Sequence, residues 1–343
     1  MKTKIYKIVA CTLSIVLTIA LLSLATDITE NKMSDYKFND FFNEKNDYDV
    51  LFFGSSHIVN GIYPMDLWND YGIVSYNMAG HGTQIPTTYW ILKNSLDYTN
   101  PKLVVIDGYL LSNNYKTSEQ YKYLHFSFDA FPLSINKIKA IFDLTDDPVI
   151  KDLMNRGLIK NEPRTKLELM WDFSIYHSRW EELMEEDFTN PSSPTKGADI
   201  NKGNYRYVNN YVNDGKIINE STVAMNYMQK MIDLCKSKGI EVLLTYLPVS
   251  SQEEICYRES NTLKLMAKNN NVNFISYLDN DLIDGLTDFA DKDSHLNQSG
   301  ASKITKSIGE YIISTYNINN RKKDDNFQKW NIDYQNYLKF INK

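Results

Sequence analysis

The sequence predicts an α/β fold built on a parallel β-sheet. Two observations carry this prediction: short apolar runs recur along the chain, and segments with apolar residues at helical spacing separate them. The runs are long enough for strands and too short for buried helices. Near-continuous apolar strands are typical of parallel sheets with helices on both faces. Connections of these lengths fit right-handed crossovers between parallel strands.

Five segments are predicted as strands, because each is an apolar or β-branched run bounded by glycine, proline or polar residues. They are residues 50–53, 72–77, 103–107, 240–246 and 272–277. Helices are predicted where apolar residues recur every three or four positions. They are residues 65–68, 86–97, 221–238, 251–269 and 299–316. The tail at 318–343 has only weak helical character.

The region between the third and fourth strands breaks this pattern. We interpret residues 112–215 as an insertion in one large domain that spans 47–317. Its first part is rich in tyrosine, phenylalanine and lysine, and helices are predicted over 135–144 and 166–186. These aromatic side chains either line a groove or pack the insertion onto the sheet.

The N-terminus, residues 1–30, is predicted to be a membrane anchor. Lysines precede an apolar run over 8–25, which at 1.5 Å per residue nearly spans a hydrocarbon core of about 30 Å. The positive-inside rule places the lysines in the cytoplasm and the rest of the chain outside it, after a spacer at 31–46. A cleaved signal peptide is the alternative, because Ser23-Leu24-Ala25 is an acceptable cleavage site.

Composition limits the classes of function. The net charge of −6 argues against a nucleic-acid partner, which would require a basic face. The three cysteines, Cys11, Cys235 and Cys256, do not make a disulfide framework. In an oxidising compartment Cys235 and Cys256 could form a bridge, and two buried thiols are the alternative. No residue pattern indicates a cofactor.

The first strand ends in polar residues suited to chemistry. Gly54 allows a sharp turn, and Ser55, Ser56 and His57 follow it. In open α/β sheets, sites lie at the carboxyl ends of the strands. A second polar cluster, at 291–297, follows the fifth strand. Because parallel strands bring both clusters to one edge of the sheet, a serine can meet an imidazole there.

Two sequence blocks resemble those of the SGNH (GDSL-like) esterase and acyltransferase superfamily. They are Phe53-Gly54-Ser55-Ser56-His57 and Asp291-Lys292-Asp293-Ser294-His295-Leu296-Asn297. The likeness is closer to membrane-anchored envelope members of the type represented by the D-alanyl-teichoic-acid transfer protein, which carry Gly-Ser-Ser. The resemblance covers 47–112 and 220–316 and leaves out the insertion. It implies a flavodoxin-like three-layer αβα sandwich.

By this resemblance Ser56 is the nucleophile and Ser55 stands where the family usually has aspartate. His295 is the general base. The position three before His295 is Lys292, so the orienting carboxylate is either Asp291 or Asp293. A helical turn would favour Asp291, because residues four apart share a face, and an extended turn would favour Asp293.

The resemblance also predicts an oxyanion hole made by the amide of Ser56 with that of Gly80 or Gly82. The asparagine of the family's third block is missing, since Asp107-Gly108-Tyr109 follows the third strand. Four residues are predicted to line the pocket: Ser55, His57, His81 and Tyr109. His57, His81 and His295 show no metal-ligand spacing, so no metal site is predicted.

These residues predict a membrane-anchored, serine-dependent O-acyltransferase or esterase. By resemblance its substrate is a cell-envelope polysaccharide or a teichoic-acid-like polymer, and a polytopic membrane acyltransferase could deliver the acyl group. The alternative is a catalytically inactive envelope protein that keeps the fold and binds a glycan or such a partner. The missing asparagine and the irregular carboxylate spacing leave this alternative open.

Overall fold

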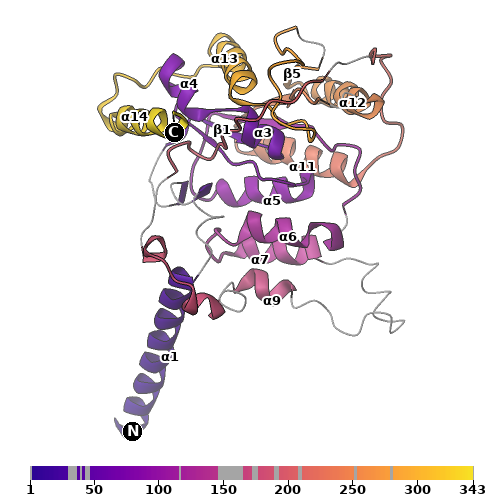
Figure 1. Cartoon of the computed structure of the whole chain (residues 1–343). Helices are drawn as coiled ribbons and strands as arrows, with labels where there is room; N and C mark the ends of the chain where they lie inside the picture. Colours follow the sequence, from indigo (N-terminus) through magenta and orange to yellow (C-terminus); the bar gives the residue numbers. More distant parts are fainter. Residues whose placement is uncertain are drawn as a thin grey trace.

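The structure is a computed structural model of the chain (Figure 1). Within it, the residues described are 2–29, 37–38, 41–42, 47–115, 117–145, 165–171, 177–188, 193–207, 211–250, 253–278 and 281–342. Most of the predicted spacer at 31–46 therefore lies outside the described residues, as does part of the predicted insertion. The described residues include every candidate site residue named above.

The centre of the fold is a five-stranded parallel sheet in the order β2-β1-β3-β4-β5. Its strands are β1 (Val50–Phe53), β2 (Ser75–Asn77), β3 (Leu103–Asp107), β4 (Glu241–Tyr246) and β5 (Asn273–Ser276). This is the flavodoxin-like strand order, in which the sequence direction reverses between β1 and β3. The predicted fold class is confirmed, and all five predicted strands are present.

Helices cover both faces of the sheet. Alternate β1 residues point to opposite faces, so Leu51 and Phe53 belong to one core cluster and Val50 and Phe52 to the other. The first cluster is covered by α5 (Ile85–Ser95), α11 (Val223–Ser237) and α12 (Glu254–Asn270). The second is covered by α3 (Ser56–Gly61), α4 (Pro64–Tyr71) and α13 (Gln298–Thr315). The predicted three-layer sandwich is thus formed.

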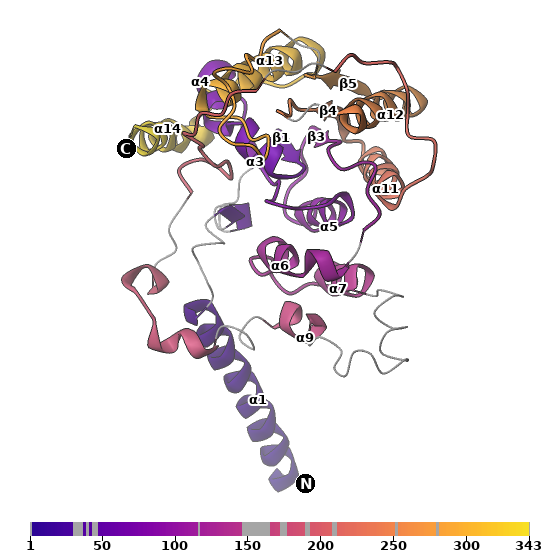
Figure 2. The ribbon, with the colours of Figure 1, turned by 45° about the vertical axis from the view of Figure 1, so that its right-hand side comes forward.

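The insertion adds a further layer outside α5. Figures 1 and 2 show α6 (Thr117–Phe128), α7 (Ile135–Thr145) and α9 (Thr165–Met170) on the side of α5 that faces away from the sheet. A third apolar cluster joins them to α5 through Trp90. Phe128, the buried aromatic residue of α6 in this cluster, packs against the neighbouring helices and not toward solvent. The insertion is helical here, as predicted.

The boundaries inside the insertion differ from the prediction. The predicted helix over 166–186 is wrong, because the described part of it contains only α9 and the 3-10 helices η1 (His177–Glu181) and η2 (Glu185–Phe188). Helix α6 was not predicted. Its sequence has weak helical periodicity, and the helix is stabilised by burying Leu124 and Phe128 against neighbouring helices.

The C-terminal tail forms a packed helix. After η3 (Asp325–Phe327), helix α14 (Lys329–Ile341) lies against α4 and buries Trp330 and Tyr337. The rings of Trp330 and Trp68 are 5.6 Å apart. Weak helical character in the sequence therefore becomes a stable helix through tertiary contact.

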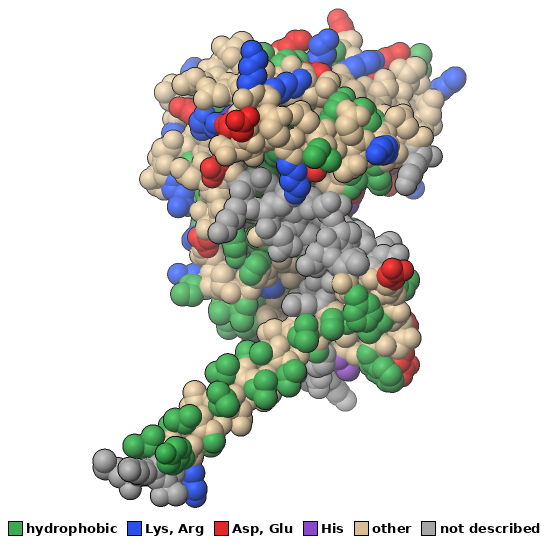
Figure 3. All heavy atoms as spheres, turned by 90° about the vertical axis from the view of Figure 1, so that its left-hand side faces the viewer, with side chains coloured by type: hydrophobic (Ala, Val, Ile, Leu, Met, Phe, Trp, Pro, Cys, Tyr) green, Lys and Arg blue, Asp and Glu red, His purple; other side chains and the backbone are tan. Residues whose placement is uncertain are grey.

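Helix α1 (Lys2–Thr29) projects from the body as a long rod (Figure 1). The candidate span runs from Lys4 to Thr26, its most apolar stretch of 18 residues has a mean hydropathy of 2.5, and this stretch is not buried in the body. By length and composition this helix can cross a membrane, and a signal sequence would satisfy the same criteria. Figure 3 shows its apolar side chains exposed along its length.

Candidate active site

The first strand delivers two serines to the carboxyl edge of the sheet. Gly54 follows β1, and a Cβ atom at this glycine would lie 2.8 Å from Cγ1 of Ile58 and 3.0 Å from Cβ of Asp107. Only glycine therefore fits this close approach. Ser55 is the N-cap of α3, with its Oγ accepting from the amide of His57, and Ser56 is the first residue of the helix.

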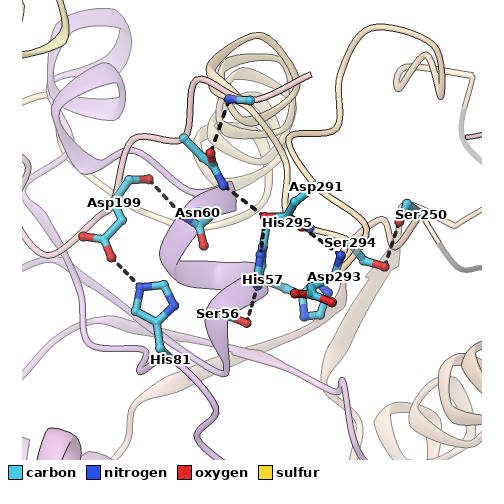
Figure 4. Close-up of polar contacts among 12 residues, drawn as sticks. Ser56, His57, Asn60, His81, Asp199, Ser250, Asp291, Asp293, Ser294 and His295 are labelled. Atoms are coloured by element: carbon cyan, nitrogen blue, oxygen red, sulfur yellow. Dashed lines mark hydrogen bonds and ion pairs between the residues drawn. The ribbon is translucent and has the colours of Figure 1, made fainter. Parts of the chain in front are cut away.

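Ser56 meets an imidazole from the opposite end of the sequence. Nε2 of His295 lies 2.8 Å from Oγ of Ser56, and Nδ1 of His295 lies 2.9 Å from Oδ2 of Asp291 (Figure 4). The segment that carries Asp291 and His295 follows β5 and leads into α13. The convergence expected from the parallel sheet is present in the structure.

Of the two candidate carboxylates, Asp291 is the one that contacts His295. Its Oδ1 accepts from the amide of Asp293 at 2.9 Å and from the amide of His295 at 3.3 Å. The turn thus folds around this carboxylate and brings residues four apart together. The backbone of Asp293 supports the turn, and no hydrogen bond joins its carboxylate to His295 among the described contacts.

The electrostatics favour a histidine ready to accept a proton. Partial burial raises the pKa of Asp291, but the hydrogen bonds from the His295 side chain and backbone lower it by more, so the net pKa lies below the ordinary value. The ionised carboxylate requires Nδ1 of His295 to carry the proton. In the neutral ring Nε2 is then an acceptor that faces the Ser56 hydroxyl.

His57 lies beside this arrangement and has a different character. Its ring centroid is 5.7 Å from that of His295 and 4.0 Å from that of Tyr109, and its Nδ1 is 3.2 Å from Oγ of Ser55. Burial, helped by the nearby His295 and opposed by Asp291, lowers the pKa of His57 to about 3. His57 is therefore neutral. Its buried Nε2 has no hydrogen-bond partner among the described residues.

The predicted oxyanion hole needs one correction. The amide of Gly80 donates to the carbonyl of Gly54 at 3.2 Å, which removes Gly80 as a free donor. The amide of Ser56 lies in the first turn of α3, where amides have no carbonyl partner within the helix. Gly82 has a φ of +63° and lies against the ring of Tyr123. The amides of Ser56 and Gly82 remain the predicted donors.

Asp107 occupies the end of β3, where the family's third block begins. Its two carboxylate oxygens accept from the amide of Leu247 at 3.0 Å and from that of Tyr109 at 3.1 Å. Burial raises the pKa of Asp107 to about 7. Asp107 therefore joins the carboxyl ends of β3 and β4 through its bond to Leu247. Its bond to the amide of Tyr109 holds that residue beside His57.

The insertion supplies two polar residues that the sequence analysis missed. Nδ2 of Asn201 donates to Oδ2 of Asp291 at 3.3 Å, and the carboxylate of Asp199 bonds to Nε2 of His81. The ring centroid of His81 is 6.4 Å from that of His295. Segment 193–207 thus returns from the insertion to the rim of the site. Neither residue belongs to a recognisable motif, so no sequence signal identifies them.

The described residues contain no group of three or more His, Cys, Asp or Glu side chains arranged to hold a metal ion. The observed arrangement is a chain of hydrogen bonds from Asp291 through His295 to Ser56. Together with the flavodoxin-like sheet, it defines an α/β protein with a Ser-His-Asp site at the carboxyl edge.

Comparisons with known proteins give structural neighbours only. No protein-family model matches the chain, and no curated protein does. A "putative acylhydrolase" from Bacteroides fragilis is similar, with a TM-score of 0.40, 14% identity and coverage of 81% of this chain and 95% of the other. A GDSL-like lipase from Bacteroides thetaiotaomicron has a TM-score of 0.38 and 12% identity, covering 78% of this chain and 88% of the other.

The second neighbour is a GDSL-like lipase, and GDSL-like is also the class that the two sequence blocks of this chain resemble. Similarity at this level does not define a function.

Proposed function

We propose that this chain is a serine-dependent esterase or O-acyltransferase. One observation carries the proposal: Oγ of Ser56 lies 2.8 Å from Nε2 of His295, while Nδ1 of His295 is held by Asp291. A serine hydroxyl becomes an effective nucleophile when an imidazole can take its proton and a carboxylate stabilises the resulting imidazolium. These three groups meet that requirement.

The reaction proceeds in two halves. Oγ of Ser56 attacks the carbonyl carbon of an ester while His295 takes the hydroxyl proton, and an anionic tetrahedral intermediate forms. The intermediate collapses as the bond to the leaving alcohol breaks, and His295 returns the proton to that oxygen. An acyl ester on Ser56 remains. A second hydroxyl, from water or from an acceptor alcohol, then gives its proton to His295 and attacks the acyl carbon. The bond from this carbon to Oγ of Ser56 breaks, and His295 returns the proton to Oγ, so the acyl group leaves on the acceptor and the serine is restored.

We further propose that the enzyme is anchored by α1 with its body outside the cytoplasm. The lysines that precede the span favour the cytoplasmic side for the N-terminus. An envelope polysaccharide or a teichoic-acid-like polymer is then the accessible acceptor, and a polytopic membrane acyltransferase is a suitable donor partner. Segment 193–207, which is absent from the resembling blocks, brings Asp199 to His81 at the rim where such an acceptor would lie.

A fluorophosphonate probe tests the nucleophile directly, because it phosphonylates an activated serine hydroxyl. We expect labelling of the wild type and of Ser237→Ala, which alters an exposed hydroxyl on α11, and no labelling of Ser56→Ala. A folded but unlabelled wild type would refute the enzyme and favour the catalytically inactive binding protein. Base-labile envelope acyl esters in cells carrying Ser56→Ala then distinguish transfer from hydrolysis: loss of esters indicates transfer and accumulation indicates hydrolysis.

A further inference from the structure

Three large apolar side chains are exposed next to the end of α1 that meets the body. Trp180 in η1 is 65% exposed, Met184 is 50% exposed and Phe188 in η2 is 65% exposed. We call these three residues the apolar patch. In Figure 3, hydrophobic side chains gather beside this end of the helix. Exposed aromatic residues grouped in this way usually mark a surface that contacts something.

The position of the apolar patch relative to α1 is fixed by contacts. Both η1 and η2 pack against α1. Nη1 of Arg179 donates to the carbonyl of Thr29 at 2.7 Å, and Nη2 of Arg179 lies 3.0 Å from Oδ1 of Asp187. One guanidinium thus joins the last residue of α1 to both 3-10 helices. Figures 1 and 2 show these segments beside the same end of α1.

This location corresponds to the boundary of a membrane that α1 would cross. The apolar span ends at Thr26, three residues before Thr29, which is about 5 Å along a helix that rises 1.5 Å per residue. A patch attached at Thr29 therefore lies at the level of the lipid headgroups. Tryptophan is enriched at this level, because its ring is apolar and its N–H reaches water.

We propose that the apolar patch inserts into the headgroup boundary of the bilayer, so that the body contacts lipid beside its anchor. The proposal depends on α1 staying attached and crossing the membrane, and it is independent of the chemistry at Ser56. Glu181, Glu182 and Glu185 are exposed on the same segments. Their charge opposes attraction to anionic lipids, so the contact is made by apolar burial and needs no anionic headgroup.

The test uses the full chain, with α1 intact, reconstituted in phosphatidylcholine nanodiscs. Tryptophan emission is measured with ordinary lipid and with lipid brominated near the headgroup end of the acyl chains. The Trp180 signal is the difference between wild type and Trp180→Phe, a change that keeps an aromatic ring in the patch. We expect headgroup-side bromine to at least halve this signal, and bromine near the chain ends to quench it less. Replacing half of the lipid with phosphatidylglycerol should not increase the quenching.

A matched control places an indole elsewhere. Ile332 on α14 is 64% exposed, and α14 lies well away from α1 in Figures 1 and 2, so Trp180→Phe with Ile332→Trp should give added emission that bromine does not quench. Equal emission of Trp180 in brominated and ordinary lipid would overturn the proposal and leave a protein partner as the occupant of the patch. Quenching of the added indole at Ile332 would also overturn it, because the whole body would then touch lipid without a defined surface.

Discussion

Asn201 donates a hydrogen bond of 3.3 Å to Oδ2 of Asp291, the same oxygen that accepts from Nδ1 of His295. An insertion residue therefore supports the carboxylate that orients the candidate base. A shared acceptor of this kind fixes the direction of the carboxylate without touching the nucleophile. Asn201 is thus a positioning residue, and its effect can be separated from that of Asp291.

Asn201→Ala should lower kcat/KM for p-nitrophenyl acetate by about three- to tenfold, because a hydrogen bond of this kind contributes about 0.5–1.5 kcal/mol. KM should change little, since Asn201 acts through its contact with Asp291. Asn213→Ala, which removes an exposed amide that bonds to Asn261 and not to Asp291, is the control. An unchanged kcat in Asn201→Ala would show that the carboxylate holds its direction without this contact.

Asp291→Asn should reduce kcat by about 10³–10⁴, because an amide at this position favours the wrong tautomer of His295. Asp293→Asn should cost less than about tenfold, since only the backbone of Asp293 supports the turn. Steady-state rates and fluorophosphonate labelling rates measure both variants. The opposite order of effects would assign the orienting role to Asp293.

His57 should make the protein sensitive to acid. Its pKa falls from an ordinary 6.5 to about 3 on folding, so the unfolded chain binds more protons between these values and the free energy of unfolding rises with pH. Acidification through this range therefore destabilises the fold. From about pH 7 to about pH 5, wild type should lose about 2 kcal/mol more stability than His57→Gln.

Urea unfolding followed by circular dichroism at the two pH values measures this difference. Asp107 titrates in the same range with the opposite sign, since burial raises its pKa to about 7. Its contribution is common to wild type and His57→Gln and cancels in the comparison. Equal pH dependence in the two proteins would mean that folding leaves the pKa of His57 unchanged, which would contradict its burial in a neutral form.

Gly54→Ala should destabilise the fold by about 1–3 kcal/mol, because the new methyl group would meet Ile58 at 2.8 Å and Asp107 at 3.0 Å. Gly215→Ala is a useful comparison, since Gly215 has a φ of +75° and open space around it. It measures the backbone cost alone, about 1–2 kcal/mol. Melting temperatures for the two variants test the contrast, and a Gly54→Ala protein as stable as wild type would refute close packing at this turn.

Much of the fold could be predicted from local patterns. Strands β1, β3 and β4 are largely apolar runs followed closely by glycine or proline, and helices α5, α11, α12 and α13 have regular apolar spacing. These signals depend on neighbouring residues, so they are present in the sequence. The convergence of Ser56 and His295 could also be predicted from the sequence, because all strands of a parallel sheet end at the same edge.

Other features depended on contacts between distant segments. Helices α6 and α14 form because their aromatic residues find partners elsewhere in the fold. Gly80 is unsuitable as an oxyanion donor because its amide donates to the carbonyl of Gly54, and only the tertiary structure reveals this hydrogen bond.

The sequence by itself determined the sheet, the apolar N-terminal helix and the two blocks that bear Ser56 and His295. The tertiary structure decided between Asp291 and Asp293, because the shape of the turn sets which carboxylate reaches Nδ1. It also brought Asn201 to the site, since long-range contacts carry no local sequence signal.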